Sequence, residues 1–270
     1  MRTAPTAAAS WKGLLQAPPP AAHIAQVYDS DQFLARAVAH FAAEGLERGE
    51  AVLLTGTAEH LAAIRAVLRA LGADADAACA RRQLTYMDAR EGLRAITVDG
   101  ALDEARYLAT AGAALAAADD PRFARLRWWG EMTQLLHEAG DTAGAMRAEA
   151  LIGEIGNDGR ITVLCSFSCD RFDPGAYDGV LGKLCCTHSH VIPADDYVRH
   201  RLAVNEAIAE VLGGLGGAHL HSLSRWQGPP CELPSSQALL FWLRETMPAE
   251  FPVVLARAKA SYARGQASQP

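Results

Sequence analysis

The chain has 270 residues, 50% of them hydrophobic, and a formal net charge of −6. This is enough for one large α/β domain, or for one domain with a small appendage, and it excludes a wholly disordered chain. The charges are spread without a basic stripe, so nucleic acid is not expected as a direct partner.

Residues 1–22 mix alanine, proline and threonine and are predicted to be disordered. They contain no apolar run long enough for a signal peptide, and the prolines from Pro18 to Pro20 would break one. No later stretch approaches the roughly 20 apolar residues of a membrane span. We therefore expect a cytoplasmic protein without a membrane partner, whose six cysteines are reduced thiols.

From residue 23 onward, short apolar runs alternate with amphipathic stretches, which is typical of a mainly parallel sheet between two layers of helices. The apolar runs predict strands over residues 24–28, 51–55, 84–87, 161–167 and 188–192. Alternating charged and apolar residues predict a further strand over residues 125–129. Helical spacing of apolar residues predicts helices over residues 33–46, 61–71, 103–118 and 141–155, and from about 176. The pattern predicts a three-layer α/β fold.

The character of the chain changes after Pro193. Amphipathic spacing predicts one helix over residues 197–212 and a final helical stretch over residues 236–264. These helices lack the basic face of a DNA-reading helix-turn-helix, and the segment is too short for a kinase core. We therefore expect residues 196–270 to form a helical C-terminal extension of a domain that covers residues 23–195.

Five runs in order resemble the MEDS family, a sensory domain named from methanogens, methylotrophs and a dichloromethane-responsive regulator. The runs are His23-Ile24-Ala25-Gln26-Val27-Tyr28, Phe41 through Gly45-Leu46 to Gly49-Glu50, Arg127 through Gly130-Glu131-Met132, Val163-Leu164-Cys165-Ser166-Phe167, and His188 before Val191-Ile192. The resemblance implies a fold akin to RecA and the circadian-clock ATPases. It also implies a sensory rather than a catalytic role, with a ligand of unknown identity.

The turn after residue 55 does not predict nucleotide binding. A phosphate-binding loop reads G-x-x-x-x-G-K-[ST], because backbone amides and a lysine must surround the phosphates. Here the turn has no second glycine and no lysine, and Glu59 would repel phosphate. We therefore expect Thr57 to be a helix cap, the nucleotide loop to be non-functional, and the protein to use no cofactor.

Glu131 follows a predicted central strand, at the edge where open α/β sheets bind ligands. Arg127 has the same strand parity, and Trp128 and Trp129 could form an apolar wall. The alternative is a surface glutamate at the start of a helix, where the helix dipole favours it. The residues alone leave both open, and the resemblance favours a ligand site.

Histidines and cysteines give further candidates. The resemblance implies a ligand-facing role for His23, although a single histidine beside a strand is more often structural. Tyr28, Cys165 and His188 are further candidate ligand contacts. Cys165, Cys186 and His188 could supply part of a zinc site. Buried thiols that pack like small apolar side chains are the more common outcome, so no metal is expected.

We therefore predict a binding module rather than an enzyme. Its small-molecule ligand would be held by Glu131, Arg127 and His23, and its output would pass to a protein partner or a second copy of the chain. No nucleophile elbow appears in the sequence. Two alternatives stay open, namely a pure interaction protein and a metal- or thiol-dependent enzyme or redox sensor. The second would use Cys165, Cys169, Cys185, Cys186 and His188.

Overall fold

The computed structural model describes residues 10–118, 120–155, 159–213 and 228–267. The chain divides into two compact units. The first, here called the sheet unit, comprises Lys12–Ser168, and the second, the C-terminal unit, comprises Met1–Trp11 and Cys169–Pro270. Each unit is described by itself.

The sheet unit alternates strands and helices along the chain. Its strands are β1 (His23–Tyr28), β2 (Ala51–Gly56), β3 (Leu84–Asp88), β4 (Thr97–Val98), β5 (Ala101–Leu102), β6 (Leu126–Gly130) and β7 (Ile161–Ser168). Its helices are α1 (Trp11–Gln16), α2 (Asp31–Glu47), α3 (Ala58–Ala70), α4 (Ala75–Ala80), α5 (Ala89–Ile96), α6 (Glu104–Ala118), α7 (Met132–Glu138) and α8 (Thr142–Ile155).

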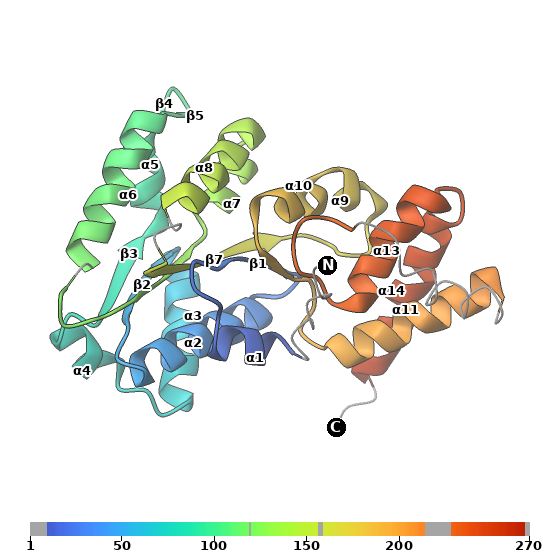
Figure 1. Ribbon diagram of the computed structural model, residues 1–270, viewed down its shortest axis with the longest axis horizontal. Coiled ribbons are helices and arrows are strands. Elements are labelled where there is room, and N and C mark those ends of the chain that lie inside the picture. The colour runs from blue at the N-terminus through green and yellow to red at the C-terminus, as the bar shows by residue number, and fades with distance from the viewer. Residues whose placement is uncertain (1–9, 119, 156–158, 214–227, 268–270) are drawn as a thin grey trace. The chain divides into compact units, whose positions relative to one another are not determined.

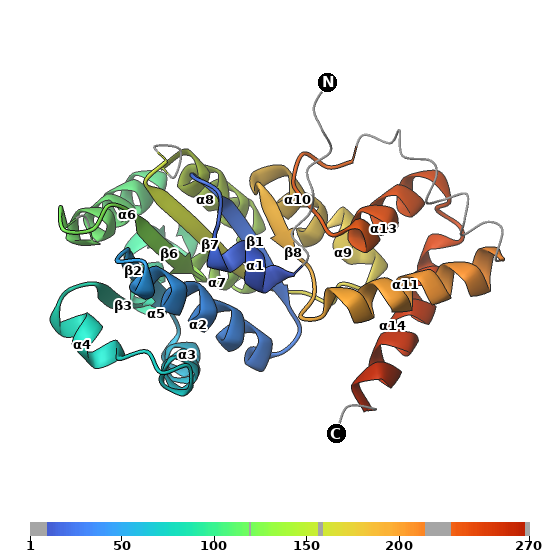
Figure 2. The same cartoon turned by 60° about the horizontal axis from the view of Figure 1, so that its bottom comes forward.

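Five strands of this unit form a parallel sheet in the order β3-β2-β6-β7-β1, while β4 and β5 form a separate antiparallel pair. Side chains alternate between the two faces of a strand. The register therefore puts His23, Cys165 and Trp128 on one face and Gln26, Ser166 and Trp129 on the other. Figure 1 shows α5 to α8 on one side of these strands and α2 and α3 on the opposite side, and Figure 2 shows α2 in front of the sheet.

Arg127 occupies a buried socket on the α2 face and is 1% exposed. Its Nε donates to Glu50, and its Nη1 donates to the carbonyl oxygens of Leu15 at 2.7 Å and Phe41 at 3.0 Å. Gly45 of α2 leaves space for the arginine side chain, because a Cβ at this position would lie 2.7 Å from Arg127 Cδ. The socket ties α1, α2 and β6 together.

A hydrogen-bond chain satisfies the polar groups buried elsewhere on the same face. Trp129 Nε1 donates to Ser166 Oγ at 2.9 Å, and that hydroxyl donates to Gln26 Oε1 at 2.8 Å. Gln26 Nε2 then donates to the carbonyl oxygen of Phe33 at 3.2 Å. Because each group has a partner, the cost of burying it is largely offset.

The C-terminal unit contains α9 (Pro174–Asp178), α10 (Val180–Thr187), β8 (His190–Ile192), α11 (Tyr197–Leu212), α13 (Ser235–Thr246) and α14 (Phe251–Ala267). Helix α11 packs against α14 and α13. His200, on α11, is fully buried, stacks on Phe172 with ring centroids 5.6 Å apart, and lies 2.8 Å from Ser236 Oγ through its Nδ1.

The parallel sheet, its flanking helices and the C-terminal helices confirm the predicted α/β class. The relation to RecA and the missing nucleotide loop stay predictions. The predicted cap is confirmed, because Thr57 Oγ1 accepts from the backbone N–H of His60 at the start of α3. Among the described residues, no helix combines the length and the hydrophobicity that crossing a membrane requires.

Three predicted elements differ in detail. Residues 11–16 of the segment expected to be disordered form α1, while residues 1–9 lie outside the described part of the chain. His188 precedes the last strand, because its backbone N–H bonds to the carbonyl of Leu184 and ends α10. The final helical stretch is two helices, since Pro248 cannot continue α13.

Candidate functional site

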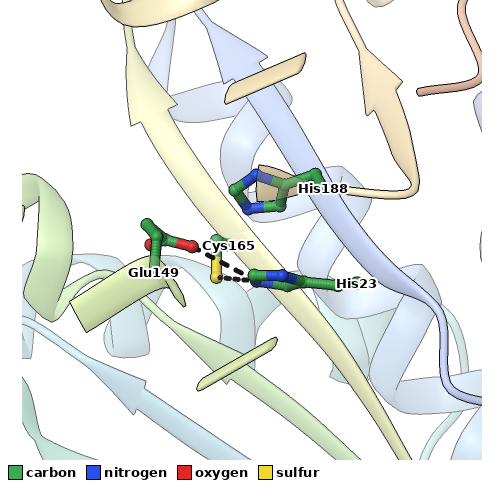
Figure 3. Close-up of side chains that lie close together, drawn as sticks. All are labelled: His23, Glu149, Cys165 and His188. Atoms are coloured by element: carbon green, nitrogen blue, oxygen red, sulfur yellow. Dashed lines mark hydrogen bonds and ion pairs between the residues drawn. The ribbon is translucent and has the colours of Figure 1, made fainter. Parts of the chain in front are cut away.

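Three ionisable side chains meet in the interior of the sheet unit, on the face that α7 and α8 cover. His23 begins β1, Cys165 lies within β7, and Glu149 comes from α8. His23 Nε2 lies 3.2 Å from Glu149 Oε2 and 3.4 Å from Cys165 Sγ, and the dashed lines of Figure 3 mark both contacts. All three residues are buried, with exposures of 7%, 0% and 4% for His23, Glu149 and Cys165. We call them the His-Glu-Cys cluster.

The environment of Cys165 keeps its sulfur protonated. Burial raises the pKa of the thiol well above its ordinary value, and the nearby negative charge of Glu149 and a hydrogen bond to it raise the pKa further. The thiol can then donate to the carboxylate. The cluster therefore combines a carboxylate, an imidazole and a thiol within a space that water hardly reaches.

A small cavity borders the cluster. It has a volume of about 20 Å³, and Cys165 and Glu149 line it together with apolar groups and one threonine; the other lining residues are Tyr107, Trp128, Gly130, Met132, Thr133, Ile152 and Val163. By this measure one water needs about 10–15 Å³, so the cavity accepts a group of one or two heavy atoms. A cavity that is apolar except at a few polar points is typical of a site for a small ligand.

A second polar group lies where β6 and β2 end. Glu131, which is 2% exposed, accepts from the backbone N–H of Thr57 at the start of α3. Its other oxygen lies 2.6 Å from His60 Nδ1, and the opposite ring nitrogen of His60 lies 3.5 Å from Asp31. Tyr28 contacts the edge of the His60 ring. Glu131 thus directly follows β6 as predicted, and it is buried rather than a surface residue.

Changing Glu131 to glutamine is expected to lower the pKa of His60. The hydrogen bond that the His60 ring donates to Glu131 is the largest cause that raises this pKa above 6.5, and burial opposes it. The stabilisation from this pair is complete below about pH 6.5 and is lost as the pH rises through the raised pKa of the folded protein. An NMR titration of the His60 ring would measure the change, and Glu59→Gln, an exposed carboxylate one residue away, should leave the titration unchanged. An unaltered titration in Glu131→Gln would contradict this account.

The structure separates the three polar anchors that the sequence suggested. Arg127 lies in its own socket with Glu50, Glu131 pairs with His60, and His23 belongs to the His-Glu-Cys cluster. Trp128 lines the cavity, whereas Trp129 points to the other face of the sheet. Their predicted roles in ligand binding are therefore distributed over three places in the sheet unit.

The remaining cysteines and His188 lie in the C-terminal unit, apart from Cys79. His188, which Figure 3 also draws, is 4% exposed, and its Nδ1 lies 3.1 Å from the carbonyl oxygen of Leu184. On α10, Cys185 is buried and Cys186 is exposed, while Cys169 is half-buried. A hydrogen bond with Cys231, followed by burial, raises the pKa of the Cys185 thiol. All six cysteines are free thiols, and the suggested zinc ligands Cys165, Cys186 and His188 stay a prediction.

Sequence reasoning missed Glu149 and His60 as site residues. Glu149 stands on the apolar stripe of its helix, between Met146 and Ile152, where a carboxylate is out of place. That position was the available signal. His60 follows the turn that does not predict nucleotide binding, and nothing in the sequence indicates that it contacts Glu131.

Comparison with protein-family models finds one matching family. The sequence model of one family, described as MEDS, the MEthanogen/methylotroph, DcmR Sensory domain, matches residues 22–189, which is more than half of the chain. The matched range contains the whole His-Glu-Cys cluster and the Glu131–His60 pair. Comparison with curated proteins finds no match.

Proposed function

The chain belongs to the MEDS family of sensory domains, and on that basis we propose that it binds a small uncharged molecule in the cavity beside the His-Glu-Cys cluster. The observation that carries the proposal is the presence of Glu149 and Cys165 in the wall of an otherwise largely apolar cavity. Binding there would be reported to a protein partner or a second copy of the chain.

The chemistry of the wall selects the ligand class. A buried carboxylate repels anions and accepts hydrogen bonds, so a neutral donor such as a small alcohol fits better than a carboxylic acid. The cavity of about 20 Å³ limits the ligand to very few heavy atoms. At a ceiling of about −1.5 kcal/mol per heavy atom, a ligand with two heavy atoms binds with a Kd no tighter than several millimolar.

Methanol is the probe that tests the proposal. Saturation-transfer NMR of the full chain should detect methanol binding, and Val163→Ile should abolish it, because the added methyl group takes up the space beside Cys165. Val27→Ile is the matched control, since Val27 is fully buried in β1 and does not line the cavity. Equal methanol signals in the wild type and Val163→Ile would refute the cavity as the binding site.

We also propose that the chain does not bind ATP, and the hydrogen bonding at the start of α3 supports this. In a phosphate-binding loop the backbone N–H groups at this position would face phosphate oxygens. Here the N–H of Thr57 donates to the Glu131 carboxylate, which already supplies the negative charge. A phosphate group would have to displace a buried carboxylate.

The other predicted ligand contacts do not line this cavity, so their predicted roles stand apart from the proposal; they are Tyr28, Arg127, Trp129, Glu131 and His188. The C-terminal helices are the part of the chain that we propose as the output. On α11, Val198 and Leu202 are 55% and 60% exposed and stand four residues apart, so they lie on one side of the helix. Exposed apolar side chains in this arrangement are suited to contact with another protein.

A further inference from the structure

We infer that the His-Glu-Cys cluster binds a divalent transition-metal ion of the zinc class, through His23 Nε2, Glu149 Oε2 and Cys165 Sγ. The inference rests on the proposed function in one respect, since it places the ion beside the cavity that would hold the small ligand. The three donors come from β1, α8 and β7, so the fold itself brings them together.

The distances between the donors fit such an ion. Bonds of about 2.0–2.3 Å in tetrahedral geometry place neighbouring ligand atoms about 3.3–3.6 Å apart. The imidazole nitrogen lies 3.2 Å from the carboxylate oxygen and 3.4 Å from the sulfur. All three donor atoms lie within 4.8 Å of one another. Small shifts of the side chains would suffice to complete the coordination geometry.

The charges of the three donors also fit. A neutral imidazole, a carboxylate and a thiolate carry two negative charges, which balance a divalent cation in a buried space. Binding forms a bond between the metal and Cys165 Sγ, and the thiol proton leaves to solvent. A buried ion pair between His23 and Glu149 does not by itself require the thiol of Cys165 beside it.

The donor types select the metal. Calcium and magnesium prefer sites made of oxygen atoms, whereas thiolate and imidazole favour zinc and similar transition metals. Catalytic zinc sites use three protein donors, the number that this cluster supplies. Because Glu149 and Cys165 also line the cavity, an ion held between them would border it. The ion would then be a contact for the small ligand.

Cobalt(II) titration of the full chain tests the inference. The protein is treated with a chelator, its fold is checked by circular dichroism, and cobalt is then added. We expect one cobalt ion per chain, with a sulfur-to-cobalt charge-transfer band that zinc abolishes by displacement. Cys165→Ser should lose the band. Changing a residue that only hydrogen-bonds to a metal ligand already costs about 10–100-fold in metal affinity, so His23→Gln and Glu149→Gln, which change ligands, should each weaken binding at least 100-fold.

Cys79→Ser is the matched control, because Cys79 is a half-buried thiol of the sheet unit outside the cluster. It should bind cobalt like the wild type. Folded wild-type protein without the band in excess cobalt, or a band that persists in Cys165→Ser, would overturn the inference. Should Cys165→Ser fail to fold, the affinities of the other two variants decide.

The metal site and the ligand cavity can fail separately. Methanol binding that depends on Val163, found in a protein that takes up no cobalt, would remove the metal and leave the proposed function intact. Cobalt bound through Cys165, in a protein that does not bind methanol, would remove the proposed ligand cavity and leave the metal site intact.

Discussion

Replacing Arg127 with methionine should lower the free energy of unfolding by about 3–5 kcal/mol, the usual cost of breaking a buried ion pair. Methionine fills much of the apolar space of the side chain but leaves Glu50 without its nearest cation. It also leaves the carbonyl oxygens of Leu15 and Phe41 without their donor. Urea denaturation of the two proteins would measure the difference.

Arg125→Met is the matched control for this prediction. Arg125 approaches the same carboxylate, with its Nε 3.8 Å from Glu50 Oε1, but its side chain is 32% exposed. An exposed ion pair contributes less than about 1 kcal/mol, so this change should cost little. Similar losses in the two variants would show that the Arg127 socket is not a special source of stability.

Acid should destabilise the C-terminal unit through His200. Burial, followed by the positive charge of Arg171, lowers the pKa of His200 to about 3. In the unfolded chain this pKa is about 6.5, so the unfolded state binds a proton that the folded state excludes. The free energy of unfolding should therefore fall as the pH drops below 6.5, by about 3 kcal/mol between pH 7 and pH 4.

His200→Phe should remove this part of the pH dependence, because phenylalanine can still stack on Phe172 but cannot bind a proton. Denaturation curves at pH 7 and pH 4 would show it. Ser236→Ala is the control: it removes the hydrogen-bond partner of His200 and should lower stability at both pH values without changing the slope. The same slope in His200→Phe and the wild type would rule out His200 as the cause.

The sheet could be predicted because its signals are local. Runs of mainly apolar residues, such as 51–55 and 161–167, are typical of strands buried on both faces, and both form strands. The short helices α4, α5 and α7 were missed, because six to eight residues give little periodicity to detect. The order of the strands came only with the structure.

The candidate site was less predictable, because it depends on contacts between distant segments. The sequence suggested His23 and Cys165 through the family resemblance, but it gave no reason to place them together. Glu149 completes the cluster from a helix that joins the sheet through packing. Glu131 was placed correctly at the end of β6, yet its partner His60 lies 71 residues earlier in the chain.

The Arg127 socket also constrains how related sequences can diverge. Two of the runs that carry the family resemblance, residues 41–50 and 127–132, supply its two halves. A side chain at position 45 would collide with the arginine, and a shorter residue at position 127 would remove this collision, although Val52 Cγ2 would still lie 3.1 Å from the added Cβ. Substitutions at these positions should therefore arise in a fixed order during evolution, with the arginine lost before the glycine, and the glycine restored before the arginine can return.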